Sequence, residues 1–186
     1  QEHIPSFAGE VLVIDNGSIA AELEHLRKVC DSVVFKTRIV ELGSNYGVAG
    51  GRNRTIPHVG TDWLMCLDND IYFLNNPLPQ FQQDLAVLGC HFMSLPLLDP
   101  DGKKLFARGG HLYISYEDGE LHIGAGSACR QVDTVERDVP PFLATFLFGG
   151  ACILNRTTFE KVGGYDEAMF IGFEDMLNVA EEVKDP

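Results

Sequence analysis

Long apolar runs and dense basic segments are both absent from this sequence. Its longest uncharged apolar stretch, residues 142–154, contains two glycines and is shorter than the roughly 20 residues that a membrane-spanning helix needs. We interpret it as a buried strand and expect no transmembrane segment in this chain. The formal net charge is −13, and the densest clusters of basic residues, at 52–54 and 103–104, are too small to bind a nucleic-acid backbone. Nucleic acid is therefore excluded as a partner.

Cysteine pairs and histidine clusters are also lacking. The five cysteines are widely spaced without a CxxC pair, and the six histidines show no pair at metal-ligand spacing. Neither a disulfide framework nor a zinc site is indicated, and we expect buried, reduced thiols.

The apolar content is sufficient for one globular domain. Of 186 residues, 45% are hydrophobic and 22% are charged, which favours a single domain with one sizeable core. Strand-like runs at residues 10–14, 33–42 and 63–67 alternate with helix-like segments that begin at Ser18 and Val48. This alternation predicts an α/β fold with parallel strands, in which ligands bind at the carboxyl ends of the strands.

The second half of the sequence contains patterns of both helices and strands. Asp-Gly sequences at residues 101–102 and 118–119 predict two hairpins. The other elements that we expect are a helix at 80–88, strands at 88–93 and 145–154, a short helix at 156–162, and a final helix from Glu174.

Polar residues follow the predicted strands of the first half. Asp15 ends the first strand, Asn45 follows the second, and Asp68-Asn69-Asp70 follows the apolar strand WLMCL. Two carboxylates two residues apart suit Mg²⁺ or Mn²⁺ holding a diphosphate, because these hard cations prefer oxygen ligands. The alternative is a solvated turn, which is the usual state of loop carboxylates.

The segment NYGVAGGRN, residues 45–53, opens the second predicted helix. Its N-terminal amides are placed to face phosphate oxygens, and Arg52 would add a charge-assisted contact. The alternative is a helix start rich in small residues for close packing, with Arg52 exposed.

Five segments occur in a distinctive order: VLVIDNGS (11–18), NYGVAGGRN (45–53), WLMCLDND (63–70), GGACILNRTTFEKVGGYDE (149–167) and FEDM (173–176). This order resembles the family 2 glycosyltransferases. The resemblance implies the GT-A fold, an α/β architecture with a Rossmann-like nucleotide-binding sheet, mostly parallel, and a mixed acceptor-side half. It also implies a single domain over residues 1–186, with a donor nucleotide-binding half at about 1–76 and an acceptor half at about 77–186.

The resemblance further implies roles on the donor side. Asp15 would contact the nucleobase or ribose of a sugar nucleotide, and a turn-capping aspartate is the alternative. Asn45 belongs to the same donor site, and Arg52 would approach the base and diphosphate. Asp68 and Asp70 would hold the ribose and the metal, with Asp70 closest to the metal.

On the acceptor side, Gly149 and Gly150 match small residues beneath the acceptor. Glu174 and Asp175 match the acidic pair that supplies the catalytic base, and we assign the base to Asp175. The alternative is that both acids simply favour the N-terminal dipole of the last helix.

Two features depart from the family pattern. Leu177 and Glu181 stand where a further acid and an arginine are common. Only residues 1–9 precede the first strand, where the family has another strand and helix, so roughly 20 to 30 residues are missing. We therefore expect a chain truncated at its N-terminus, with a central strand position to be filled by another segment or chain.

Taken together, the resemblance implies transfer of a sugar, with inversion and with Mn²⁺ or Mg²⁺, from a nucleoside diphosphate sugar to a hydroxyl of a saccharide, a lipid-linked glycan or a protein. One alternative is a non-catalytic sugar-nucleotide-binding module of the same fold. Another is a nucleotidyltransferase, which would need a Gly-rich loop with a basic residue after the first strand, and this sequence has none. We expect a cytoplasmic location, or one at the inner face of the membrane reached through partners or further segments.

Overall fold

The computed structural model describes residue 4 and residues 7–127 and 141–172. The chain forms two compact units whose segments alternate along the sequence. Among the described residues, the first unit contains those up to 61, 72–89 and 165–172, and the second contains 62–71 and 90–164. In this described part of the chain, no helix is both long and apolar enough to cross a membrane.

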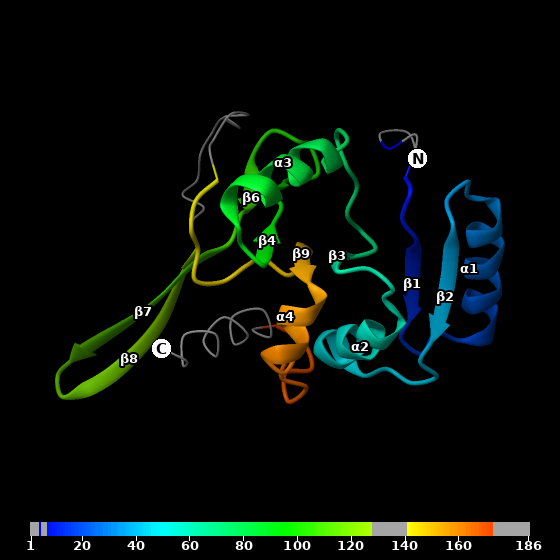
Figure 1. Ribbon diagram of the computed structural model, residues 1–186. Coiled ribbons are helices and arrows are strands. Elements are labelled where there is room, and N and C mark those ends of the chain that lie inside the picture. Colours follow the sequence, from blue (N-terminus) through cyan, green and yellow to red (C-terminus); the bar gives the residue numbers. More distant parts are fainter. Residues whose placement is uncertain (1–3, 5–6, 128–140, 173–186) are drawn as a thin grey trace. The chain divides into compact units, whose positions relative to one another are not determined.

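The first unit is built on two parallel strands, β1 (Val11–Asp15) and β2 (Thr37–Glu41), which are joined by helix α1 (Ala20–Ser32). The register places Asp15 opposite Glu41, so both strands end at the same edge. Figure 1 shows α1 lying along β2. The parallel pairing predicted from the alternation of strand and helix is confirmed for this pair.

Helix α2 (Gly47–Thr55) follows β2 and leads into a short 3₁₀ helix, Ile56–His58. The small residues at the start and middle of α2 are buried, which allows close packing of its backbone. Helix α3 (Leu78–Leu88) belongs to the same unit. It ends at Gly89, whose φ of 61° is the left-handed conformation typical of a helix C-terminus.

The second unit contains a sheet of three strands, with β9 (Ala151–Asn155) between β3 (Trp63–Leu67) and β4 (Phe92–Ser94). β9 is antiparallel to both neighbours, and none of its first four residues is more than 3% exposed. A strand covered on both faces needs an unbroken apolar sequence, which explains the run ACIL. Helix α4 (Arg156–Lys161) follows, capped by the side chain of Asn155, which accepts the Thr158 N–H at 3.0 Å.

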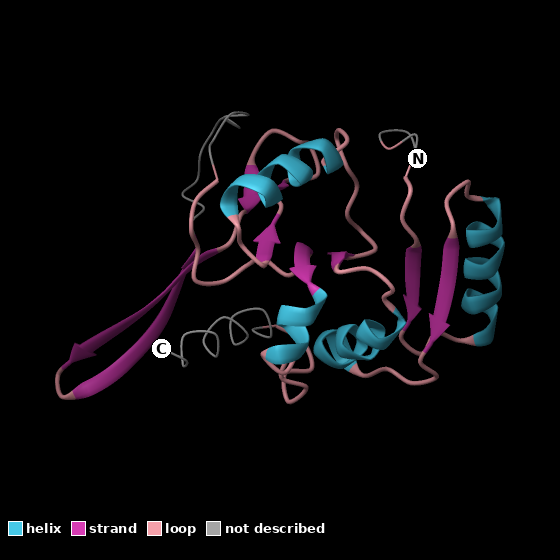
Figure 2. Ribbon diagram, in the orientation of Figure 1, coloured by secondary structure: helices cyan, strands magenta, loops and turns pink. Residues whose placement is uncertain are grey.

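Two antiparallel hairpins complete the second unit. β5 (Leu97–Leu98) pairs with β6 (Leu105–Ala107), and β7 (Gly110–Glu117) pairs with β8 (Glu120–Ser127). Figure 2 shows the β7–β8 hairpin as a long two-stranded ribbon. Asp118 and Gly119 at its turn have φ values of 51° and 85°, which is the turn geometry that an Asp-Gly pair provides. Both predicted hairpins are confirmed.

Two local predictions were wrong. The strand expected at residues 145–154 begins only at Ala151, because Gly149 and Gly150 form a turn immediately before it. Ser18 does not cap α1. Its backbone N–H donates to Asp15, and the helix begins one residue later, after Ile19.

Candidate functional site

Asp15 lies at the carboxyl end of β1 and is only 4% exposed. Its Oδ1 accepts the backbone N–H of Ser18 at 3.1 Å, so the turn-capping role weighed against donor binding is present in the structure. A carboxylate has room for further hydrogen bonds on its second oxygen. Capping therefore does not exclude contact with a donor, and that contact stays a prediction.

Asn16, the next residue, ties the end of β1 to the loop that precedes α2. Its side-chain amide donates to the Gly47 carbonyl at 2.9 Å and to Asn45 Oδ1 at 3.2 Å. Its Oδ1 accepts the Tyr46 N–H at 3.0 Å. Asn16 and Asn45 are thus brought together at the strand ends, although sequence reasoning assigned no role to Asn16. In the sequence, Asn16 could have been identified by its position directly after the candidate donor residue Asp15.

Gly17 allows the same two loops to approach closely. A Cβ at this position would lie 2.7 Å from the Ser44 carbonyl carbon and 2.8 Å from the Asn45 nitrogen, which is too close for any side chain. The φ of 90° at Gly17 also favours glycine. The turn after β1 and the loop before α2 therefore pack directly against each other.

The N-terminal amides of α2 are used by the protein itself. The Gly47 N–H donates to Asn45 Oδ1 at 2.9 Å, and the Val48 N–H donates to the Phe170 carbonyl at 2.8 Å. The expectation that this helix start faces phosphate oxygens is not supported for these two amides. The close-packing alternative is supported instead, because a Cβ on Gly51 would lie 3.1 Å from the Asn16 side chain.

Arg52 is half-buried rather than exposed. Its guanidinium carbon lies 5.7 Å from the centre of the Tyr165 ring, within range of a cation–π interaction. Tyr165 is itself buried. The predicted approach of Arg52 to the base and diphosphate of a donor stays a prediction.

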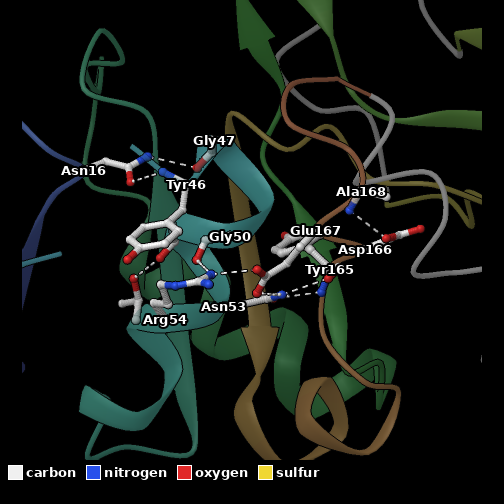
Figure 3. A network of polar contacts seen from close by, with 12 residues as sticks. Asn16, Tyr46, Gly47, Gly50, Asn53, Arg54, Tyr165, Asp166, Glu167 and Ala168 are labelled. Carbon is white, nitrogen blue, oxygen red and sulfur yellow. Dashed lines mark hydrogen bonds and ion pairs between the residues drawn. The ribbon is translucent and has the colours of Figure 1, made fainter. Parts of the chain in front are cut away.

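A second network joins the C-terminal half of α2 to residues 165–167 (Figure 3). Asn53 accepts the Tyr165 N–H at 2.9 Å and donates to the Tyr165 carbonyl at 2.8 Å. Arg54 forms an ion pair with Glu167 at 2.8 Å. Hydrogen bonds from Arg54 and then Asn53 hold the pKa of Glu167 below its usual value. Sequence reasoning missed these residues, although Asn53 and Glu167 stood inside the quoted motifs.

In the second unit, Asp68 follows the last residue of β3. Its N–H donates to the Gly150 carbonyl at 2.9 Å, which continues the β3–β9 ladder by one pair. A Cβ on Gly150 would lie only 3.2 Å from Asp68 Oδ2. The structure therefore brings the predicted donor residue Asp68 together with the predicted acceptor-side residue Gly150, and the absence of a Cβ on Gly150 permits this close approach.

This corner suits a divalent cation with further ligands. Asp68, Asn69 and Asp70 are exposed and supply hard oxygen donors. Within the described residues, no three His, Cys, Asp or Glu side chains gather closely enough to hold a metal by themselves. Such a site therefore fits Mn²⁺ or Mg²⁺ only with additional oxygen ligands, which a nucleoside diphosphate would supply.

Two predictions concern positions that the structure does not determine. Glu174 and Asp175 fall outside the described residues. Asp15, Asn45 and Arg52 belong to the first unit, while the Asp68–Asp70 turn and Gly149–Gly150 belong to the second. Their convergence on one donor site stays a prediction.

Known proteins resemble this chain in sequence and fold. Residues 7–163 match the sequence model described as Glycosyl transferase family 2, whereas no curated protein matches. One similar structure is "Mannosyltransferase PcManGT from Pyrobaculum calidifontis in complex with GDP-Man and Mn2+", with a TM-score of 0.59, 15% identity, and coverage of 91% of this chain and 41% of that one. Another is "GalNAc-T7 with UDP, GalNAc and Mn2+", with a TM-score of 0.63, 15% identity, and coverage of 93% and 34%.

The chain thus spans less than half the length of either of these two structures. The family match covers most of the present sequence and includes three of its five characteristic segments in full and most of a fourth. The chain belongs to glycosyl transferase family 2 and has the GT-A fold.

Proposed function

We propose that this chain is the catalytic domain of a glycosyltransferase. It takes a sugar from a nucleoside diphosphate sugar, transfers it with inversion to an acceptor hydroxyl, and depends on Mn²⁺ or Mg²⁺. Family membership supports glycosyl transfer as the general reaction. The donor class and the metal are further supported by the two similar structures, which are complexes with GDP-Man or UDP together with Mn²⁺.

The observation that carries the proposal is the corner between β3 and β9. Asp68 and Asp70 follow β3 directly, and the Asp68 N–H donates to the carbonyl of Gly150, whose lack of a Cβ permits the close approach of the Asp68 carboxylate. Both acidic residues are exposed at this corner, so a cation with further oxygen ligands has access to them. The arrangement therefore favours ligand binding over the solvated-turn alternative.

Each residue has a defined task in this proposal. Asp15 and Arg52 bind the nucleoside and diphosphate of the donor, with Asn45 as part of the same edge. Asp68 and Asp70 hold the cation, and a bound Mn²⁺ or Mg²⁺ supplies positive charge that stabilises the departing diphosphate. Gly149 and Gly150 leave space for the acceptor.

Inversion requires one displacement at the anomeric carbon. The acceptor oxygen forms the new bond as the bond to the diphosphate oxygen breaks, and attack from the opposite face inverts the configuration. Asp175 takes the proton of the acceptor hydroxyl, which is the task of a general base. Glu174 supports it as the second member of the acidic pair.

A panel of sugar nucleotides tests this function directly. The parent protein is incubated with UDP-, GDP- and dTDP-sugars and Mn²⁺, with hydroxyl acceptors drawn from saccharides, lipid-linked glycans and proteins. We expect release of nucleoside diphosphate with one donor, its dependence on metal, and a product whose anomeric configuration, read by NMR, is opposite to that of the donor. Tight donor binding with neither transfer nor hydrolysis would instead identify a non-catalytic binding module.

A further inference from the structure

Phe106 is an exposed aromatic residue at an irregular point of the β5–β6 hairpin. Two pairs of this hairpin, Leu97–Ala107 and Leu98–Leu105, are one residue apart on β5 and two residues apart on β6. Phe106 is therefore the extra residue of a β-bulge, a feature that redirects a side chain out of the regular alternation of a strand. It is 58% exposed, although its neighbour Ala107 is buried. The bulge thus keeps an apolar ring in contact with solvent.

A second aromatic ring lies beside Phe106. The ring centres of Phe106 and Phe148 are 5.8 Å apart, and the angle between the ring planes is 90°, which is the edge-to-face arrangement that aromatic pairs favour. Phe148 is half-buried, so it supports Phe106 from the protein side and leaves more than half of Phe106 accessible. We call these two residues the Phe106–Phe148 pair.

The Phe106–Phe148 pair lies next to the corner that holds Asp68. Phe148 is two residues before Gly150, so the covalent chain limits the distance between their Cα atoms to about 7 Å. The Gly150 carbonyl accepts the Asp68 N–H at 2.9 Å. The β5–β6 hairpin reaches the same glycine, because a Cβ on Gly150 would lie 3.4 Å from Leu97 Cδ1. All these residues belong to the second unit, so they are neighbours within one compact body.

The chemistry of an exposed ring at this place fits a sugar. A pyranose has hydroxyls around its rim and C–H groups on its faces, and these C–H groups pack against the apolar face of an aromatic ring. One exposed phenylalanine offers about the area of one pyranose face. A lipid chain, by contrast, gains affinity with each buried CH₂ and needs a more extended apolar surface. The side chain of a serine or threonine acceptor has no ring face to stack.

We propose that the Phe106–Phe148 pair binds the acceptor, a saccharide, by stacking one pyranose face against Phe106. The inference rests on the function proposed above, in which a metal-bound diphosphate at Asp68 brings the donor to this corner. It narrows the acceptor to a sugar, either free or at the end of a lipid-linked glycan. The alternative is that two apolar side chains simply pack together, since single exposed hydrophobic residues are common. The bulge at Phe106 and the neighbouring Asp68–Asp70 turn favour binding.

Acceptor kinetics with a panel of probes test this role. The probes are methyl glycosides of glucose, galactose, mannose and N-acetylglucosamine, the octyl glycosides of the same sugars below their micelle concentrations, and a peptide that contains serine and threonine. We expect transfer to at least one glycoside and none to the peptide. A lower KM for the octyl than for the methyl glycoside would identify a lipid-linked acceptor, whereas equal values would identify a free saccharide.

Variants of Phe106 then show whether the ring binds the acceptor. Phe106→Ala and Phe106→Leu should raise the acceptor KM by about 3- to 10-fold, the range of one aromatic contact, and keep the donor KM within about twofold. Phe106→Trp should retain the parent values because it keeps a ring. Tyr116→Ala is the matched control, since Tyr116 is an aromatic residue of the same unit that is 73% exposed on β7. It should leave both KM values unchanged.

A second measurement does not depend on turnover. Saturation-transfer NMR detects which protons of a bound glycoside contact the protein. With UDP or GDP and Mg²⁺, which replaces the paramagnetic Mn²⁺, the C–H protons of one pyranose face should respond in the parent and in Tyr116→Ala. The response should fall markedly in Phe106→Ala and Phe106→Leu. Their Tm values should stay close to that of the parent, because substitutions at exposed positions usually change stability little.

The outcomes distinguish this proposal from the proposed function. If the parent transfers sugar and Phe106→Ala keeps the parent acceptor KM, the acceptor role of the pair is wrong while the proposed function stands. The same conclusion follows if the parent transfers only to the peptide, if only the donor KM rises, or if Tyr116→Ala has an equal effect. If the parent binds a donor but neither transfers nor hydrolyses it, the proposed function fails, and the acceptor role fails with it.

Discussion

Asp15 is buried although it is acidic, and it has two candidate tasks that chemistry can separate. One oxygen caps the turn after β1 by accepting the Ser18 N–H. The other task, binding the donor's ribose or base, would use the negative charge. Capping needs only an oxygen acceptor, whereas a hydrogen bond to a charged acceptor is stronger than one to a neutral acceptor.

Substitution of Asp15 should therefore separate stability from donor binding. Asp15→Asn keeps an acceptor for Ser18, so we expect a nearly unchanged Tm but a loss of nucleotide affinity of about tenfold or more. Asp15→Ala removes the cap as well and should lower the free energy of unfolding by about 1 kcal/mol. Calorimetric titration with UDP or GDP and Mn²⁺, together with urea denaturation, measures both. Equal affinity in the parent and Asp15→Asn would leave only the capping role.

Asp175 can be tested by its effect on rate. Asp175→Asn has nearly the same volume and also caps a helix well, so a residue that only favours the helix dipole would tolerate it. If Asp175 is the general base, Asp175→Asn should lower the transfer rate by about 10²- to 10⁴-fold and leave donor affinity intact. Single-turnover kinetics at saturating donor provide the comparison, and transfer at the parent rate would remove Asp175 from the mechanism.

Sequence reasoning located the strand-end residues but not the partners that fix them. Asp15, Asn45 and Asp68 were identified because each follows an apolar strand, a local pattern. Asn53 and Tyr165, by contrast, are 112 positions apart, and no local pattern shows that a helix and a later loop meet. The resemblance supplied the motifs that contain these residues, but only the fold pairs them.

At the scale of helices and strands, glycines determine where β9 begins. The strand expected from residue 145 starts after Gly149–Gly150, because the turn there brings Gly150 against Asp68. Hydrophobicity predicted the buried strand correctly but could not locate its first residue, since the apolar sequence continues upstream of the turn. In α2, three glycines lower the helix propensity, and their burial in close packing explains why they are tolerated.

Gly150→Ala tests the close approach of β9 to the DxD turn. The new Cβ would lie 3.2 Å from Asp68 Oδ2 and 3.3 Å from Ile71 Cδ1, so these neighbours must shift. We expect the free energy of unfolding to fall by about 1 kcal/mol and nucleotide-dependent Mn²⁺ binding to weaken in calorimetry. Gly60→Ala is the matched control, because a Cβ there meets nothing within 4 Å. If both variants bind metal as the parent does, Gly150 has no part in shaping the site.

The ion pairs of the first unit make its stability depend on pH in a defined direction. The pKa of Glu167 is lowered from its ordinary value of 4.5, chiefly by Arg54. A lowered pKa in the folded state means that the contribution is complete above the unfolded-state pKa and is lost as the pH falls through the folded value. The stability difference between the parent and Glu167→Gln should therefore be largest near pH 7 and shrink below about pH 4.5.

Urea denaturation at pH 7, 5 and 3.5 measures this dependence. Glu10→Gln should follow the same trend, because Arg38 and then Lys36 lower the pKa of Glu10. A stability difference that stays constant across this range would show that the charge of Glu167 is not what Arg54 recognises in the folded state.

At the scale of the whole molecule, the predicted donor site is shared between the two units. The first unit holds Asp15 and Arg52, and the second holds Asp68 and Asp70. The order of motifs predicted the family and the fold correctly, since the family match extends from residue 7 to 163 across both units. Motif order contains no distances, however, so it could not establish whether the donor residues of the two units form one site.

A shared donor site predicts that one ligand protects both units at once. Hydrogen exchange with mass spectrometry should show slower exchange at residues 14–19 of the first unit and 67–71 of the second when donor nucleotide and Mn²⁺ are added, with the same midpoint for both segments. Asp70→Asn should abolish protection in both, because a cation held in the second unit completes its coordination with phosphates of the same nucleotide that the first unit binds. Asp118→Asn provides the charge-matched control, since Asp118 lies at the β7–β8 turn with a φ of 51° that asparagine also adopts. Loss of protection confined to residues 67–71 in Asp70→Asn would show that the two units bind separately, and the single donor site would then be wrong.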